Sequence, residues 1–235
     1  MRINKYIAKS GLCSRRKAEE LIINNEVSVN DVLIKELAFK VDEKKDIVKV
    51  KGKIISIKEE LVYYLLNKPI GYISSAKDER GRKTVIDLLK EVKERIYPIG
   101  RLDYDTSGLL LLTNDGDLTY KITHPKHNIN KVYEAYVEGI PTKDEIYSFE
   151  KGLNIEDYKT SKAKIDIIDI KGKNSVVRIT IHEGKNRQVR KMCDKINHPV
   201  IKLKRVSIGN IKLNNLKEGK YRPLTNQEIK YLYSL

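Results

Sequence analysis

The chain has 235 residues, of which 40% are hydrophobic, so it can form one sizeable core or a small and a larger one. No apolar run approaches the roughly 18 residues that span a membrane, and residues 1–17 lack the apolar segment of a secretory signal. The two cysteines, Cys13 and Cys193, fit a reducing cytosol and exclude a four-thiolate zinc site. We therefore expect a cytoplasmic protein with no membrane partner.

The net charge of +15 is unevenly distributed along the chain. Residues 182–235 hold 13 Lys and Arg against 4 Asp and Glu, an excess of nine positive charges. A basic patch on a cytosolic protein favours a nucleic-acid partner over a membrane surface. Solvated charge that serves only solubility is the alternative at this point.

Residues 1–60 have the pattern of a separate small module. Ile3 and Ile7, four residues apart, predict a short helix, and Ser14 is a suitable N-cap for the next helix. The segments VSVND, VLI and DIVKVKG are typical of short strands joined by tight turns. Residues 56–60 predict a linker, so we place a domain boundary after residue 60.

The second helix of this module begins with cations. Positive charge in a first turn opposes the helix dipole at a cost of a few tenths of a kcal/mol per residue. Free N–H groups at a helix start favour a phosphate instead. Phosphate binding is therefore the favoured explanation, and solvated surface charge is the alternative. The RNA-binding candidates of this module are Arg15, Arg16 and Lys17.

Together, these segments resemble the S-four RNA-binding domain, through RINKYIAKSGLCSRRKAEELI and the following VSVN. Members of that family usually have Asn-Gly after the V-x-V strand, where this chain has Asn30 and Asp31. Aspartate tolerates the left-handed turn, so the departure is small. The resemblance implies that residues 1–60 bind structured RNA.

Residues 61–235 predict a second, larger domain. Residues 61–69 have the pattern of a buried strand, and a polar loop over residues 76–83 precedes a helix expected over residues 84–94. The segments RIYPIG and LLLLT predict two further strands. Asp117 is expected to cap the short helix that follows them.

Two later segments alternate between apolar and polar residues, as half-buried strands do. Residues 131–139 place Tyr133 on the apolar face, and residues 176–181 form the other strand. The helix that follows has an apolar face formed by Val189, Met192, Cys193 and Ile196. Strands and helices mix without a regular βαβ repeat, which predicts an α+β fold with a mixed, largely antiparallel sheet.

The segment GRLDYDTSGLLLLT places two acids, Asp103 and Asp105, at the start of its apolar strand. The spacing matches the first half of a calcium loop, but Asn114 stands where a bidentate glutamate is needed. His124 and His127 form an H-x-x-H pair without a third ligand. We therefore predict no metal site, which leaves ordinary turn chemistry or a catalytic carboxylate as explanations.

The second domain resembles the pseudouridine synthases. The matching motifs occur in this order: NKPIGYISS, GRKTVIDLL, GRLD with SGLLLLTNDG, KVY, EGKNRQVRKM and LKR. They resemble the branch typified by the ribosomal small-subunit synthase A and large-subunit synthase B. With the S-four module, the resemblance covers essentially the whole chain. It implies an RNA pseudouridine synthase that isomerises one uridine of ribosomal RNA and uses no cofactor or metal.

The resemblance also implies residue roles. Asp103 corresponds to the nucleophilic aspartate, Tyr133 to the tyrosine that packs on the target uracil, and Leu203 to an active-site leucine. Arg190 corresponds to the basic residue that pairs with the aspartate, and such a guanidinium keeps a buried carboxylate ionised. We expect Arg101 to point away from Asp103, and Arg190 to contact it.

Turn geometry then accounts for Asp105. The helix after Asn186 again opens with cations, which repeats the phosphate argument of the first module. The RNA-binding candidates of the second domain are Arg101, Lys185, Arg187, Lys191, Lys204 and Arg205.

The choice of substrate rests on finer similarity. Arginine after Gln-Val in EGKNRQVRKM, together with GLNIEDYKTSKAKI, resembles the large-subunit enzymes and favours 23S over 16S rRNA. The expected setting is rRNA modification during ribosome biogenesis, by a monomer acting on pre-ribosomal particles. The rivals are a non-catalytic RNA-binding ribosome-assembly factor and a metal-dependent RNA hydrolase.

Overall fold

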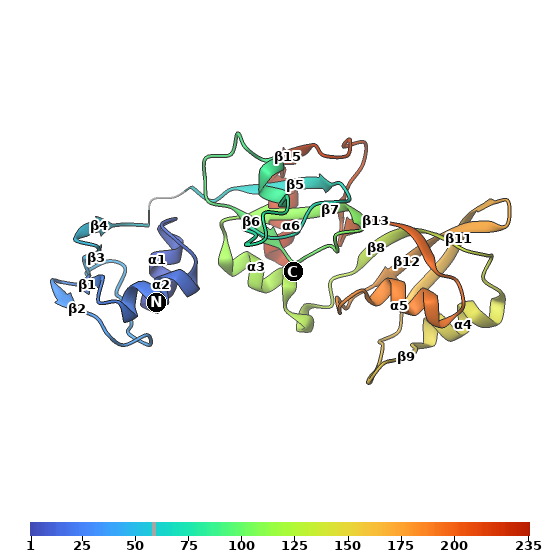
Figure 1. Cartoon of the computed structure of the whole chain (residues 1–235), viewed down its shortest axis with the longest axis horizontal. Coiled ribbons are helices and arrows are strands. Elements are labelled where there is room, and N and C mark those ends of the chain that lie inside the picture. Colours follow the sequence, from blue (N-terminus) through green and yellow to red (C-terminus); the bar gives the residue numbers. More distant parts are fainter. Residues whose placement is uncertain (58–59) are drawn as a thin grey trace. The chain divides into compact units, whose positions relative to one another are not determined.

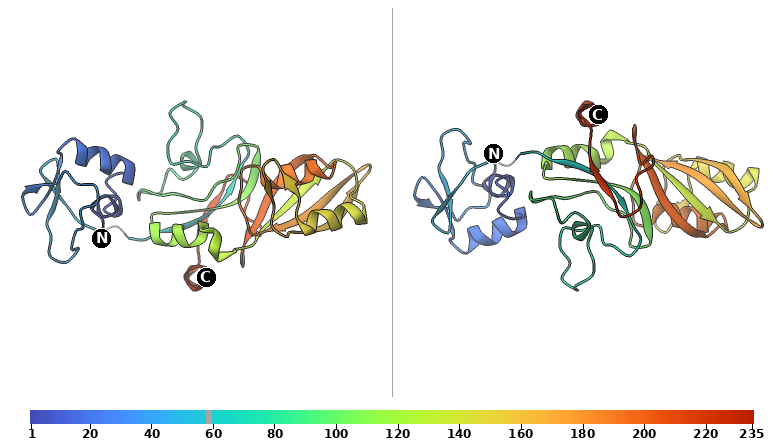
Figure 2. Two further views of the ribbon diagram at one scale, coloured as in Figure 1. Left: turned by 90° about the horizontal axis from the view of Figure 1, so that it is seen from below. Right: turned by 90° about the horizontal axis from the view of Figure 1, so that it is seen from above.

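The computed structural model describes residues 1–57 and 60–235, and the chain divides into two units (Figures 1 and 2). The N-terminal unit comprises Met1–Val62 with Val92–Arg95 and Asn114–Gly116, and the C-terminal unit holds the remainder. The linker predicted over residues 56–60 includes residues 58–59, which lie outside the described residues. Within the described ranges, no helix has the length and apolar character needed to cross a membrane.

The N-terminal unit packs two helices and a four-stranded antiparallel sheet, in the order β2-β1-β3-β4, around one core. Its elements are α1 (Ile3–Lys9), α2 (Arg15–Ile23), β1 (Val27–Val29), β2 (Val32–Leu33), β3 (Val48–Val50) and β4 (Lys53–Ile55). The Ser14 side chain caps α2 by accepting the N–H of Lys17, as predicted. Asn30 and Asp31 have φ of 50° and 66°, the left-handed pair that a two-residue hairpin turn requires.

The C-terminal unit is built on a nine-stranded sheet with the main path β11-β12-β8-β13-β7-β5-β15, while β14 pairs with β13 and β6 with β7. Its strands are β5 (Tyr63–Lys68), β6 (Tyr97–Ile99), β7 (Thr106–Thr113), β8 (Lys131–Val137), β11 (Lys164–Lys171), β12 (Asn174–Ile181), β13 (Val200–Ile208), β14 (Ile211–Lys212) and β15 (Tyr221–Pro223). A separate hairpin joins β9 (Asn154–Ile155) to β10 (Tyr158–Lys159). Among the strands that the structure describes in this sheet, only β13 and β7 pair in parallel, so the predicted α+β class with a mixed, largely antiparallel sheet is confirmed.

Helices cover this sheet in two groups. One face of β8, β11, β12 and β13 carries α4 (Lys143–Lys151) and α5 (Gln188–Lys195), as Figures 1 and 2 show. The core around β7 includes residues of α3 (Gly116–Thr123) and α6 (Asn226–Ser234). Two short 3-10 helices complete the unit, η1 (Val85–Leu88) and η2 (Pro125–His127). The predicted apolar face of α5 is buried.

Strand β7 positions the candidate site. Its residues 109–112 are all fully buried, as expected for a continuous apolar run covered on both faces. Strand β13 lies parallel to β7, with Leu203 beside Thr106 and Arg205 beside Gly108. Strand β8 pairs with the other side of β13. This register brings the start of β7 close to residues of β13 and β8.

Two local predictions are wrong. The helix expected over residues 84–94 is the single turn η1, because buried Leu89 leaves the helical region with φ −115° and ψ 39°. Asp117 lies in the first turn of α3, which begins one residue earlier, at Gly116. In the first case, the backbone leaves the helical region at Leu89, before the helical sequence pattern ends.

We predict that Gly108→Ala lowers the free energy of unfolding by at least about 2 kcal/mol. Gly108 has φ +108°, and a Cβ there would lie 2.2 Å from the backbone oxygen of Arg205. The parallel β7–β13 pair would therefore have to separate. Gly172→Ala is the control, because Gly172 also has a positive φ but nothing lies within 4 Å of its added Cβ. Equal losses in urea denaturation would contradict the close-approach explanation.

Candidate active site

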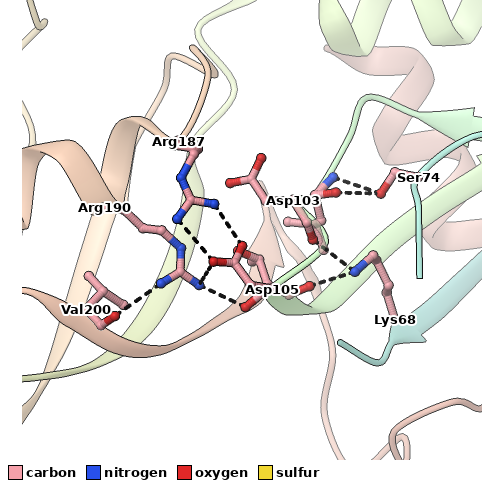
Figure 3. A network of polar contacts seen from close by, with 9 residues as sticks. Lys68, Ser74, Asp103, Asp105, Arg187, Arg190 and Val200 are labelled. Atoms are coloured by element: carbon pink, nitrogen blue, oxygen red, sulfur yellow. Dashed lines mark hydrogen bonds and ion pairs between the residues drawn. The ribbon is translucent and has the colours of Figure 1, made fainter. Parts of the chain in front are cut away.

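A buried lysine, Lys68, forms hydrogen bonds to the backbone of the loop that carries Asp103. Lys68, the last residue of β5, has no exposed surface. Its ammonium group donates to the carbonyl oxygens of Pro69 at 3.0 Å, Asp103 at 3.0 Å and Thr106 at 2.8 Å (Figure 3). A lysine has three N–H donors, so all three are used. The backbone before and after the Asp103 turn is thereby fixed to one point.

A serine fixes the residue before Asp103. The Ser74 hydroxyl donates to the carbonyl oxygen of Leu102 at 2.8 Å, and its oxygen accepts the Leu102 N–H at 3.0 Å. The N–H of Thr106 donates to the Asp103 carbonyl at 3.1 Å, which closes the turn. Asp103 therefore belongs to a short segment whose backbone hydrogen bonds are made on both sides.

The side chain of Asp103 itself is free. Among the residues that the structure describes, its carboxylate makes no hydrogen bond and no ion pair, and Figure 3 shows it on the side of Arg187. Asp103 is half-buried. The backbone therefore supplies the rigidity of this group, and its two oxygens stay available to a substrate.

The neighbouring acid, Asp105, forms the ion pairs with Arg187 and Arg190. Arg187 binds the Asp105 carboxylate through two hydrogen bonds of 3.0 and 3.1 Å. Arg190 donates to the Asp105 carbonyl at 2.8 Å and lies 3.3 Å from its carboxylate. Burial works to raise the pKa of Asp105, but the hydrogen bonds from Arg187 and the charges of both arginines outweigh it and lower that pKa.

The expected contact of Arg190 with Asp103 is therefore wrong, as is the explanation of Asp105 by turn geometry alone. Arg190 is 7% exposed and also donates to the Val200 carbonyl at 3.2 Å. Its guanidinium therefore contacts Asp105 and Val200, and not Asp103. Arg187 is the cation next to Asp103. Its pKa is raised, first by hydrogen bonding to Asp105 and further by the charges of Asp105 and Asp103.

A cavity of about 600 Å³ opens beside Asp103. Tyr133 and Leu203 line it and are 8% and 5% exposed, so three of the predicted catalytic residues share one cavity. The predicted RNA-binding residues that also line it are Arg101, Lys185, Arg187 and Arg205. Its volume lies within the usual range of small-molecule sites.

Other predicted residues lie elsewhere. Arg190, Lys191 and Lys204 do not line this cavity, as far as the described residues define it. Lys191 pairs with Glu156 at 2.9 Å. The three cations of the first module, Arg15, Arg16 and Lys17, are exposed at the start of α2 in the N-terminal unit.

Two expectations about arginine side chains need correction. Arg101 lines the same cavity as Asp103 and does not point away from it, since side chains two residues apart share one face of an extended segment. Arg205 is only 4% exposed and donates to the Leu109 carbonyl at 2.8 Å, so it belongs to the interior and not to a basic surface.

Sequence reasoning missed a half-buried lysine in the cavity wall. Lys131 donates to the carbonyls of Ile129 at 3.1 Å and His182 at 2.8 Å. Burial lowers its pKa to about 8, and the charge of Arg205 contributes. Nothing in the spacing of the KVY motif predicts that its lysine donates to two backbone carbonyls.

Hydrogen bonds to Glu183 hold the cationic loop that follows β12. Glu183 accepts the backbone N–H of Ser161 at 3.2 Å and the Gln188 side chain at 2.7 Å. Gln188 in turn accepts the Lys185 N–H at 3.1 Å. This network fixes the loop between β12 and α5, which carries Lys185 and Arg187 into the cavity wall.

The cavity thus combines a carboxylate without a partner, a buried tyrosine and several cations. The RNA pseudouridylate synthase profile matches residues 62–195, and the S4 domain profile matches residues 1–58. The chain therefore belongs to the RNA pseudouridylate synthase family and is a pseudouridine synthase with an S4 domain. Over the described residues, no group of three His, Cys, Asp or Glu side chains could hold a metal ion.

Known proteins similar to this chain cover its full length. The ribosomal large subunit pseudouridine synthase B of Bacillus subtilis (strain 168) is 50% identical over 236 residues, covering 100% of this chain and 96% of that one. The dual-specificity RNA pseudouridine synthase RluF of Escherichia coli (strain K12) is 38% identical, covering 100% and 79%. A crystal structure of a pseudouridylate synthase aligns with a TM-score of 0.71 and 31% identity, over 99% of both chains.

We predict that Lys68→Met lowers the free energy of unfolding at pH 7 by at least about 2 kcal/mol, because three buried carbonyls lose their donor. Burial lowers the pKa of Lys68 to about 8, against the opposing charges of Asp103 and Asp105, from an ordinary value of 10.5. The unfolded chain therefore binds more protons between these values, and stability rises with pH across this window. Below about pH 8, Lys68 is protonated in both the folded and the unfolded chain, and this gain in stability is absent.

Urea denaturation from pH 7 to pH 10.5 measures both effects. The rise in unfolding free energy above pH 8 should be smaller in Lys68→Met than in the wild type. Lys77→Met is the control, because Lys77 is exposed. An unchanged rise in Lys68→Met would contradict the burial of a charged ammonium at this position.

Proposed function

We propose that this chain converts one uridine of 23S rRNA to pseudouridine, with Asp103 as the nucleophile. The observation that carries the proposal is the unpaired Asp103 carboxylate, fixed by its backbone in a cavity that Tyr133 and Leu203 also line. The name of the large-subunit synthase B from Bacillus subtilis supports the choice of 23S rRNA over 16S rRNA.

The chemistry needs a carboxylate and a closed site. Attack of an Asp103 oxygen on C1′ of the ribose breaks the C1′–N1 bond, and its electron pair stays with the uracil. After the uracil turns, C5 bonds to C1′, the carboxylate leaves, and the C5 proton is lost while N1 gains one. Attack on C6 of the uracil is the alternative entry to the same isomerisation. Both routes return Asp103 unchanged and balance without a cofactor.

The other cavity residues hold the substrate on this proposal. The target uridine leaves its RNA helix and enters the cavity, where the ring of Tyr133 packs on the uracil and Leu203 borders it. Arg187 and Lys185 are exposed on the wall and bind the flanking phosphates. Arg190 is a positioning residue that acts through Asp105, since both of its terminal NH2 groups are already engaged, one by the Val200 carbonyl and the other by Asp105.

The N-terminal unit supplies affinity on this proposal. The exposed cations at the start of α2, Arg15, Arg16 and Lys17, bind phosphates of structured RNA. Tethering to residues 61–235 raises the local concentration of the RNA at the catalytic cavity. The enzyme acts as a monomer in the cytosol, on rRNA within pre-ribosomal particles.

Pseudouridine mapping in a strain that lacks the gene tests the proposal. The wild type should restore one modified position in 23S rRNA, and Asp103→Asn should restore none, because removal of a nucleophile lowers the rate by at least about a thousandfold. EDTA should leave the activity of the purified protein unchanged.

Three other outcomes would contradict parts of the proposal. A restored position in 16S rRNA would overturn the substrate, and equal restoration by Asp103→Asn would overturn the nucleophile. Normal ribosome assembly with no restored position would favour the non-catalytic assembly factor. Immunoblots must show equal amounts of both proteins.

A further inference from the structure

A row of aromatic rings lies at the end of α3 beside the cavity. The rings of Tyr120 and His124 have centroids 4.9 Å apart at an interplanar angle of 53°, and those of His124 and His127 lie 6.3 Å apart at 82°. The catalytic proposal uses none of the three. The H-x-x-H spacing belongs to this row, and within the described chain it meets no third metal ligand.

The row begins at the catalytic cavity and ends in solvent. His124 and the preceding Thr123 line the cavity together with Asp103. Tyr120 is 59% exposed, and its hydroxyl makes no hydrogen bond with another described residue. The buried face of α3 is formed by Leu118 and Ile122, so packing of this helix does not require the rings.

Cations flank the row. Arg101 is exposed and lines the cavity, and the residue before it, Gly100, lies against Thr123, since an added Cβ would be 3.8 Å from its side chain. Lys126 is exposed between the two histidines. Neither cation forms an ion pair within the described residues. Tyr120 is exposed and His124 is half-buried. Aromatic rings at the surface beside unpaired cations are typical of sites that bind single-stranded nucleic acid.

We propose that Tyr120 and His124 form a stacking platform for the unpaired RNA base next to the target uridine. The inference rests on the proposed function, because it requires the target uridine to enter the cavity. A flipped base leaves its neighbour without a stacking partner, and a ring beside the cavity mouth replaces that partner. Arg101 and Lys126 bind the phosphates on either side of the stacked base.

The test uses an rRNA fragment that carries the mapped uridine, with a normal or an abasic nucleotide at each neighbouring position. Tyr120→Leu removes the ring, and Tyr120→Phe is the matched control that keeps it. On normal RNA, kcat/KM should fall about tenfold in Tyr120→Leu and less than about twofold in Tyr120→Phe. When the stacked neighbour is abasic, the three proteins should be equal, which shows that ring and base act as a pair.

A second readout needs no modification site. A short oligouridylate with one 2-aminopurine should lose fluorescence on binding the wild type and Tyr120→Phe, but not on binding Tyr120→Leu at the same occupancy. Both variants should keep the melting temperature of the wild type, because Tyr120 is exposed. Failure of the wild type to modify rRNA would overturn the proposed function, and the fluorescence result would still decide the platform.

Three results would overturn the platform. The first is an equal loss of activity by Tyr120→Leu on normal and abasic RNA, and the second is a loss in Tyr120→Phe as large as that in Tyr120→Leu. Full activity of Tyr120→Leu on purified RNA with loss of modification in cells would point to a protein partner at this surface instead.

Discussion

The candidate active site depends on one buried ammonium group. Lys68 joins the end of β5 to both sides of the Asp103 turn, and each of its three N–H groups meets a backbone carbonyl. Burial lowers the pKa of Lys68 to about 8, and the charges of Asp103 and Asp105 oppose that change, so the cation and the acidic turn stabilise each other. Because the backbone is held this way, the Asp103 side chain needs no partner of its own.

The charges around Asp103 are divided between two functions. Asp105 binds Arg190, which is buried and donates to two backbone carbonyls, and Arg187, which is exposed. An exposed ion pair contributes little, about 0 to 1 kcal/mol, so Arg187 can exchange Asp105 for an RNA phosphate at small cost. The buried arginine then maintains the loop while the exposed one meets the substrate, and both leave the carboxylate of Asp103 uncovered.

The sequence predicted elements whose signals are local. The Ser14 cap, the turn at Asn30 and the alternation of β8 need only neighbouring residues, and the structure confirms all three. The shared cavity of Asp103, Tyr133 and Leu203 was predicted through ordered motifs, not through spacing. Two partners of Lys68, the carbonyls of Asp103 and Thr106, lie 35 and 38 positions away along the chain. Because they are backbone atoms, no pattern of side chains in the sequence predicts them. The pairing of Arg190 with Asp105 was not predicted, because the resemblance assigned the basic residue to Asp103 and no spacing in the sequence distinguishes the two acids.

The central claim is that Asp103, and not its neighbour two residues on, is the reacting carboxylate. Each isomerisation releases the hydrogen at C5, so single-turnover tritium release from RNA labelled at C5 of uridine measures the chemical step alone. We predict that Asp103→Asn reduces this rate by at least about a thousandfold, while Asp105→Asn, the same change in the same loop, stays within about tenfold of the wild type. A loss in Asp105→Asn as large as that in Asp103→Asn would contradict the assignment.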